Sequence, residues 1–272
     1  MELSDSEIQI QNEAVEYIKS KKGELIDRFI IQKNPLRRSL FAFFMAGSPG
    51  AGKTEFTKRY FPIFFSKKNE ALVKAFEKAG IDVMVADKIT IRIDVDEIRD
   101  FLPQYRKTNT KNGQKGNAHI IQKAANKGLD YLRDYCLGND ISFIHDGTFG
   151  NYGTMETIIK KTILKNRIVC VYYIYLDPLI AWDFTKAREA LEGRNIKKEK
   201  FIEQFFNAQE NVCKIKKNFG EKVFVHFILK DNKNEMAKIE FNQSDIAKCL
   251  ENYYTKGTIK RYSPEDLSNL LR

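Results

Sequence analysis

This 272-residue chain has few of the residues that build disulfide frameworks or zinc sites, with 4 Cys and 3 His. The cysteines are far apart and form no CxxC pair, which favours four reduced thiols of a cytosolic protein over a disulfide framework. The histidines are equally scattered, so no zinc site follows from their spacing. These residues are Cys136, Cys170, Cys213 and Cys249, with His119, His145 and His226.

Long apolar runs are also missing. No segment is long enough to span a membrane, and the acidic start Met1–Glu7 has no apolar signal core. These absences predict a cytoplasmic protein without a membrane partner. No internal repeat or low-complexity tract divides the chain, and its hydrophobic content of 43% is ordinary for a globular protein. The length allows one large α/β domain with additional elements.

Positive charge is unevenly distributed along the chain. The net formal charge is +10, and residues 101–200 hold 17 Lys and Arg against 10 Asp and Glu, a local excess of +7. Between Phe101 and Leu129 there are six basic residues and no acidic one. Such a segment suits a phosphate-bearing acceptor or nucleic acid, although each lysine could equally belong to a solvated basic face. The six residues are Arg106, Lys107, Lys111, Lys115, Lys123 and Lys127.

The stretch Gly47-Ser-Pro-Gly-Ala-Gly-Lys-Thr54 fits GxxxxGK[ST], the pattern of a phosphate-binding loop. An apolar run at 39–46 precedes the loop and a helical pattern follows it. This is the order of strand, loop and helix that a phosphate-binding loop requires. We therefore predict a nucleoside triphosphate on the loop, with Lys53 at the terminal phosphates and the Thr54 hydroxyl on Mg²⁺. An ordinary Gly/Pro turn is the weaker alternative. The predicted nucleotide-binding residues are Gly47, Ser48, Pro49, Gly50, Ala51, Gly52, Lys53 and Thr54.

Strand patterns alternate with helical patterns over the rest of the chain. We expect strands at 39–46, 141–146, 168–176 and 223–229, an edge strand at 236–241, and one or two strands within 81–94, the second at about 89–94. Helices are expected at 5–33, 68–79, 117–136, 155–165, 179–191, 198–217, 243–254 and 264–271. This alternation predicts an α/β fold with a doubly wound, mostly parallel sheet, in which the continuous apolar run 168–176 is central.

Three further segments carry charges that suit phosphoryl transfer. In the first, Asp94 and Asp96 follow a predicted strand at the sheet edge where open α/β sheets bind ligands. A carboxylate there can accept the proton of an attacking hydroxyl. If the strand continues, the two side chains share one face; if a helix begins at Asp96, that residue projects into the crevice. The competing interpretation is that one of the two simply caps the next helix.

The second segment ends in Asp146-Gly147-Thr148, directly after another apolar strand. Asp146 could hold Mg²⁺ through water or touch the acceptor, or it could form only a strand-terminal Asx turn. The third segment places Arg188 and Arg194 on a polar helix–loop–helix at about 181–215. A phosphoryl-transfer lid needs such arginines to neutralise the transferring group, whereas a surface helix would use them in Arg–Glu pairs.

Order and spacing of these motifs resemble the zeta toxin family of small-molecule kinases over about residues 40–213. The family's D-x-D-x-[FIL]-[RK]-x-x-x-P-x-[YF] run is present as Asp94-Val-Asp-Glu-Ile-Arg-Asp-Phe-Leu-Pro-Gln-Tyr105. By resemblance Asp96 is the catalytic base, and Asp130 is an acceptor contact 16 positions before Asp146. The chain departs from the family at three places. Leu102 stands where His is frequent, and Asp130 and Asp146 stand where Glu is frequent. The two lid arginines are also separated by fewer residues.

The resemblance implies a P-loop, nucleotide-kinase-like fold with a helical lid and a kinase activity that uses ATP or GTP with Mg²⁺. The best single acceptor is the 3′-hydroxyl of UDP-N-acetylglucosamine, which implies a toxin opposed by an antitoxin protein. We divide the chain into an N-terminal helical segment, 1–38, and a kinase domain, 39–272, with the lid at 181–215 and a C-terminal region at 216–272.

The expected site residues follow from the motifs and the resemblance together. The catalytic residues are Asp96, Lys53, Arg188 and Arg194; the acceptor-binding residues are Asp96, Arg99, Asp130, Asp146 and Thr148; the metal-binding residues are Thr54 and Asp146. Two alternatives stay open. One is a kinase of nucleic-acid 5′ ends or dinucleotides, which the +7 charge favours, and the other is a nucleotide-dependent switch without kinase activity.

Overall fold

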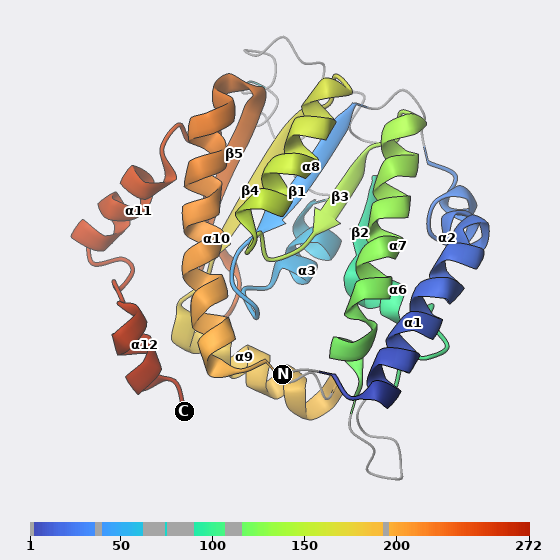
Figure 1. The fold of residues 1–272 in the computed structure, drawn as a ribbon. Coiled ribbons are helices and arrows are strands. Elements are labelled where there is room, and N and C mark those ends of the chain that lie inside the picture. The colour runs from blue at the N-terminus through green and yellow to red at the C-terminus, as the bar shows by residue number, and fades with distance from the viewer. Residues whose placement is uncertain (1–2, 36–39, 62–73, 75–89, 107–115, 193–195) are drawn as a thin grey trace.

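A twisted sheet forms the centre of the molecule in a computed structural model that describes residues 3–35, 40–61, 74, 90–106, 116–192 and 196–272 (Figure 1). Within these residues six strands run in the order β2-β3-β1-β4-β5-β6. Neighbouring strands are parallel except for β6, which is antiparallel to β5. The strands are β1 (Phe41–Ala46), β2 (Ile91–Asp94), β3 (Phe143–Asp146), β4 (Ile168–Tyr175), β5 (Val223–Lys230) and β6 (Met236–Glu240). The predicted α/β fold and the central position of 168–176 are confirmed.

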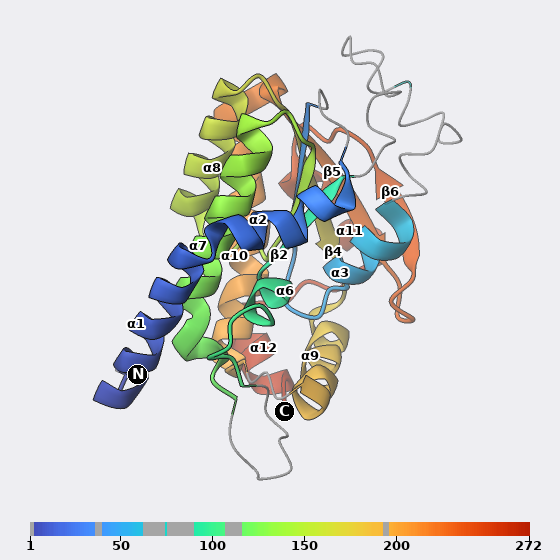
Figure 2. The same cartoon turned by 90° about the vertical axis from the view of Figure 1, so that its right-hand side faces the viewer.

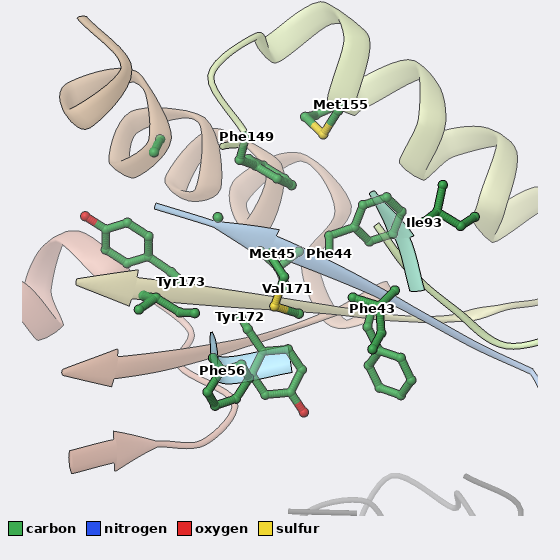
Figure 3. Packing of buried hydrophobic residues seen from close by; sticks show 14 of the residues in the cluster. Phe43, Phe44, Met45, Phe56, Ile93, Phe149, Met155, Val171, Tyr172 and Tyr173 are labelled. Atoms are coloured by element: carbon green, nitrogen blue, oxygen red, sulfur yellow. The ribbon is translucent and has the colours of Figure 1, made fainter. Parts of the chain in front are cut away.

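The first strand is buried at every residue because layers cover both faces of the sheet. Such strands read as continuous apolar runs. Successive side chains point to opposite faces, so Phe44 meets Phe143 on one side, with ring centroids 6.1 Å apart, while Phe43 meets Phe61 on the other at 4.7 Å. Figure 3 shows Phe44 on the side of Met155, and Phe43 on the opposite side of the strands. This packing fixes the strand that delivers the phosphate loop.

Three long helices, α7 (Ala118–Gly138), α8 (Tyr152–Leu164) and α10 (Lys198–Phe219), cover one face of the sheet (Figures 1 and 2). Their buried residues recur at helical spacing, as at Phe201, Phe205, Ala208 and Val212 of α10. On the other face lies α3 (Lys53–Glu55), which continues into a π-helical turn, η2 (Phe56–Tyr60). The short helix α6 (Val95–Arg99) follows β2 directly.

The N-terminal segment forms α1 (Asp5–Ser20), α2 (Lys22–Phe29) and a 3-10 turn, η1 (Ile31–Lys33). Ser4 and Glu7 form a capping box at the start. The helix expected at 5–33 is therefore interrupted at Lys21, and Gly23 lies inside α2. Both helices pack against α7, and the rings of Tyr17 and Phe29 contact Phe101 after α6.

The remaining helices are α9 (Pro178–Glu192), α11 (Ile246–Thr255) and α12 (Pro264–Leu270), with a 3-10 turn, η4 (Gly220–Lys222). Helix α12 packs on α9 and α10. Trp182 of α9 donates from Nε1 to the carbonyl of Arg272 at 2.8 Å, and Lys198 of α10 donates to the carbonyl of Ser268 at 2.9 Å. These bonds tie the two predicted lid helices to residues more than 65 positions later.

Several sequence expectations concern residues outside those that the structure describes: the helix at 68–79, the strand within 81–88, and Arg194, Lys107, Lys111 and Lys115. All four cysteines are described and form no disulfide. In the described part of the chain, no helix has the length and apolar character to cross a membrane.

Candidate active site

The phosphate loop joins β1 to α3 at the carboxyl edge of the parallel strands. Gly47, Gly50 and Gly52 have φ values of +143°, +74° and +74°, which favour glycine. A Cβ at Gly47 would lie 2.5 Å from the carbonyl oxygen of Ile174, and one at Gly50 would lie 2.0 Å from that of Ala181. The glycines therefore let the loop pass directly beside β4 and α9, the first of the two predicted lid helices.

Lys53 begins α3, and its side chain is buried inside the loop. The ammonium donates to the carbonyl oxygens of Gly47 at 3.0 Å and Ser48 at 2.5 Å. Burial lowers the pKa of Lys53 to about 8, and the nearby Asp146 carboxylate opposes that change. The predicted phosphate-binding cation is thus held at the centre of the loop by the loop's own backbone.

Next to this lysine, Thr54 donates from its hydroxyl to Oδ2 of Asp146 at 3.2 Å. The mostly covered Arg92 of β2 reaches the same oxygen with Nη2 at 2.9 Å and Nε at 3.1 Å, and it also pairs with Asp94 and Glu97. One guanidinium is therefore shared by three carboxylates at this edge. The sequence reasoning missed Arg92, although its position two residues before Asp94 places both side chains on one strand face.

Asp94 ends β2 and caps α6. Its Oδ1 accepts a hydrogen bond from the backbone N–H of Asp96 at 2.9 Å, so the capping interpretation applies to Asp94. Burial, and after it the charge of Asp96, raises the pKa of Asp94 to about 6 against the effect of Arg92. Because the helix begins at once, Asp96 lies in its first turn and leaves the strand face.

Two arginines contact Asp96. Arg99 Nη1 lies 2.6 Å from Oδ1, and Arg188 Nη2 of α9 lies 3.2 Å from Oδ2. Arg99 also contacts Gln122 of α7. The structure therefore brings together the predicted base, a predicted acceptor contact and a predicted lid arginine. The side chain of Arg188 is 45% exposed, whereas those of Asp96 and Arg99 are mostly covered.

The two remaining acceptor candidates lie in different places. Thr148 is beside the phosphate loop, since its carbonyl accepts from the N–H of Gly47 at 3.3 Å. Asp130 is on α7 and pairs with Arg133, with its side chain 58% exposed. It lies eight residues, about 12 Å along the helix, from Gln122, the α7 residue that contacts Arg99. Within the described residues, Asp130 is thus not part of the Asp96 group.

The donor set fits a magnesium ion that a phosphate completes. The Thr54 and Asp146 oxygens are 3.2 Å apart, close to the separation of about 3 Å between adjacent oxygens around octahedral Mg²⁺. No three His, Cys, Asp or Glu side chains among the described residues form a metal site by themselves. Since Arg92 already binds Oδ2 of Asp146, an ion would use the second carboxylate oxygen or displace this arginine.

Comparisons with solved structures show the fold. A structure from a study of the PezAT chromosomal toxin–antitoxin system of the human pathogen Streptococcus pneumoniae has a TM-score of 0.51 and 15% identity, with 100% of this chain and 89% of that chain covered. Two AvrRxo1-ORF1:AvrRxo1-ORF2 structures, one with sulphate ions and one with ATP, each have a TM-score of 0.52. They are 14% and 13% identical and cover 90% of this chain and 71% of those chains.

A family comparison identifies the sequence group. No curated protein matches the chain. The family model described as Zeta toxin matches residues 67–243, about two thirds of the sequence. The match begins after the phosphate loop and includes Asp96, Asp146 and Arg188, so the resemblance to the family is confirmed. The sheet order and the phosphate loop suit a kinase-like function. Because the family model matches more than half of the sequence, this chain belongs to the zeta toxin family.

Proposed function

We propose that the protein is a kinase that transfers the γ-phosphoryl group of a nucleoside triphosphate to a hydroxyl of a phosphate-bearing acceptor. The observation that carries the proposal is the contact of Asp96 with Arg188 at 3.2 Å beside the phosphate loop. Both charges act on the buried ammonium of Lys53. Phosphoryl transfer depends mainly on positioning and charge neutralisation, and these three residues supply a base and two cations at one place.

The phosphate loop would hold the triphosphate. Phosphate oxygens would replace the carbonyls of Gly47 and Ser48 as acceptors of the Lys53 ammonium, and the loop N–H groups would bind further oxygens. Thr54 and Asp146 would hold Mg²⁺, which when bound neutralises charge on the β- and γ-phosphates.

Asp96 would accept the proton of the acceptor hydroxyl as that oxygen attacks phosphorus and the nucleoside diphosphate leaves. Arg99 holds one oxygen of the carboxylate, which leaves the other to face the substrate once Arg188 moves. Arg188 would exchange Asp96 for the transferring phosphoryl group, since its side chain is half exposed on α9. Arg194 would join it as the second lid arginine.

UDP-N-acetylglucosamine, phosphorylated at its 3′-hydroxyl, is the acceptor that we propose, with ATP or GTP as donor. Family membership supports this acceptor, and the +7 charge of residues 101–200 supports any phosphate-bearing molecule. Thr148 and Asp130 would be further acceptor contacts. The protein would then act as a toxin held in check by an antitoxin protein, and one similar solved structure comes from a toxin–antitoxin system.

Mass spectrometry of reaction products tests the proposal. The chain is incubated with UDP-N-acetylglucosamine and Mg-ATP or Mg-GTP, with Asp96→Asn as the control. A product heavier by one phosphate, absent with the variant, is expected. A phosphorylated product found only with a metabolite extract or 5′-hydroxyl oligonucleotides would keep the kinase but replace the acceptor. Slow hydrolysis without transfer to any of these would contradict the kinase and favour a nucleotide-dependent switch.

A further inference from the structure

Residues 147–151 connect β3 to α8 and are called the acceptor loop here, because they include the proposed acceptor contact Thr148. Three consecutive backbone carbonyls of this loop accept hydrogen bonds from parts of the chain that are distant in the sequence. They belong to Thr148, Phe149 and Gly150. Connecting segments usually run over the surface, where water satisfies such groups, so the acceptor loop is held more firmly than its role as a connection requires.

Phe149 is the strained residue of the acceptor loop. Its φ is +64°, and a bulky side chain in this left-handed region is a genuine outlier. The ring is buried, and Figure 3 shows it on the same side of the strands as Phe44 and Met155. A strained backbone persists only where the surrounding structure over-determines it, so the loop needs a hold on the Phe149 backbone in addition to the buried ring.

Asn211 of α10 provides this hold. Its side-chain amide donates to the carbonyl oxygen of Phe149 at 2.9 Å, and the asparagine is only 5% exposed. One helical turn earlier, Asn207 donates to the carbonyl of Gly150 at 3.4 Å. Residues four positions apart lie on one helix face, so α10 presents two amides to two successive carbonyls. Asparagine is a poor helix former, and these bonds give both asparagines a physical reason to stand in a helix interior.

The acceptor loop also contacts the phosphate loop. The buried N–H of Gly47 donates to the carbonyl of Thr148 at 3.3 Å. The Thr148 hydroxyl lies beside the backbone of Gly150, since a Cβ on that glycine would be 3.3 Å from Oγ1. Both the carbonyl and the hydroxyl of Thr148 therefore depend on where α10 holds the two residues that follow it.

We propose that Asn211, assisted by Asn207, is a positioning residue for the acceptor. Asn211 holds the strained Phe149 backbone and thereby sets the place of the Thr148 hydroxyl relative to the phosphate loop. The inference rests on the proposed function, in which Thr148 contacts the acceptor. A displacement of about 1 Å in such a group can cost about 10²-fold in rate, so the loss of one buried amide on α10 should be visible in the use of the acceptor.

Hydrogen exchange of the Gly47 amide, followed by NMR on the full chain without ligands, tests the structural step. In Asn211→Ala this amide should exchange at least about tenfold faster, because its acceptor on Thr148 is no longer held in place. Asn218→Ala is the matched control, since Asn218 lies on the same helix and donates to a side chain of α8. Lys216→Met controls for lost stability, since its buried ammonium also donates to backbone carbonyls, but at the other end of α10.

Neither control should change the exchange of Gly47. If Asn211→Ala does not fold, Asn207→Ala carries the same test from a half-buried position, with a smaller expected increase of about threefold because its bond is longer. An unchanged exchange rate in the folded Asn211 or Asn207 variant would overturn the inference, whether or not the protein is a kinase.

Transfer kinetics test the functional step with a double-mutant cycle. Asn211→Ala should lower kcat/KM for the acceptor at least about tenfold and keep the nucleotide Kd within about threefold. Thr148→Val removes the hydroxyl, and in that background Asn211→Ala should cost much less, because both changes remove the same contact. Losses that simply multiply would make Asn211 a purely structural residue and overturn the inference. Faster exchange of Gly47 in a protein that transfers phosphate to no acceptor would overturn the proposed function alone.

Discussion

Arg188 of α9 donates from Nη2 to Oδ2 of Asp96 at 3.2 Å, so the predicted lid helix touches the carboxylate that follows β2. The two residues are 92 positions apart in the sequence. Because the arginine side chain is 45% exposed, such a pair contributes at most about 1 kcal/mol. A contact this weak can open without unfolding anything, and a phosphate group offers the arginine a stronger partner.

Asp96→Asn and Asp94→Asn should have very different effects on catalysis. The first removes the proposed base, so kcat should fall by about 10²–10⁴-fold while the nucleotide still binds. The second keeps an N-cap, since an asparagine oxygen also accepts from the Asp96 N–H, and kcat should stay within about tenfold. Single-turnover transfer and nucleotide titration measure both. Equal losses in the two variants would show that Asp96 has no special role.

Arg188→Met should reduce kcat on the order of 10³-fold with little change in nucleotide affinity, because an arginine aimed at the transferring group acts mainly in the transition state. Lys186→Met is the control, since Lys186 lies on the same helix and, among the described residues, contacts Glu189 and the ring of Trp182, both on α9. A loss confined to the KM for nucleotide would instead make Arg188 a ground-state binding residue.

Patterns that depend on neighbours in sequence were sufficient for much of the fold. The buried runs of β1 and β4 predict their own strands, and the N-terminal helical segment ends at Lys33, the last residue of the range 5–33, before Asn34 with φ of +46°. The predicted first residue of a helix was wrong where a capping side chain determines where the helix begins. The helix expected from Met155 begins at Tyr152, because the Asn151 side chain accepts from the Thr154 N–H at 2.9 Å.

The site was harder to predict because its contacts join distant elements. The motifs located Lys53 and Asp96, but the pairing of Asp96 with Arg188 depends on how α9 packs. Arg92 is a single charge in a β-branched run, and only the sheet order shows that it also reaches Asp146 on the next strand. Asp130 came from resemblance, and in the structure it pairs with Arg133, three residues later on the same helix.

Nucleotide affinity should depend on pH through Lys53. Burial lowers the pKa of this group to about 8 in the free protein, so the ammonium is present below pH 8 and is lost as the pH rises. Affinity for Mg-ATP should therefore be constant below about pH 7 and weaken by up to about tenfold per pH unit above pH 8. Titrations from pH 6.5 to 9.5 measure this. Lys53→Arg keeps its charge and should show no such slope over this range.

The lowered pKa of Lys53 changes the stability of the nucleotide-free protein with pH in the opposite direction to nucleotide affinity. The pKa of Lys53 is lower in the folded chain than the ordinary value of 10.5, so the unfolded chain binds more protons between pH 8 and 10.5. This group alone should make the free energy of unfolding rise with pH over that interval. In Lys53→Met the contribution is absent, and a difference in slope between wild type and variant in urea unfolding measures it; identical slopes would contradict the burial of the ammonium.

Arg92→Met should destabilise the fold by about 3–5 kcal/mol, because it leaves buried carboxylates without their shared counter-charge. The Arg92 side chain is only 12% exposed and contacts Asp94, Glu97 and Asp146. Arg59→Met is the matched control, since Arg59 is 61% exposed and lies 3.7 Å from Glu55, and it should cost less than about 1 kcal/mol. Urea unfolding followed by circular dichroism measures both.

Adding Mg²⁺ provides a second test of Arg92 as the counter-charge of these carboxylates. If the ion binds Thr54 and Asp146 with nucleotide, it supplies positive charge where Arg92 was, so Mg-ATP should restore more stability to Arg92→Met than to the wild type. Metal-free ATP should not do so, because its phosphates add negative charge beside the unpaired carboxylates. Equal stabilisation of both proteins by Mg-ATP would mean that Arg92 and the ion occupy separate places, with the ion at the second oxygen of Asp146.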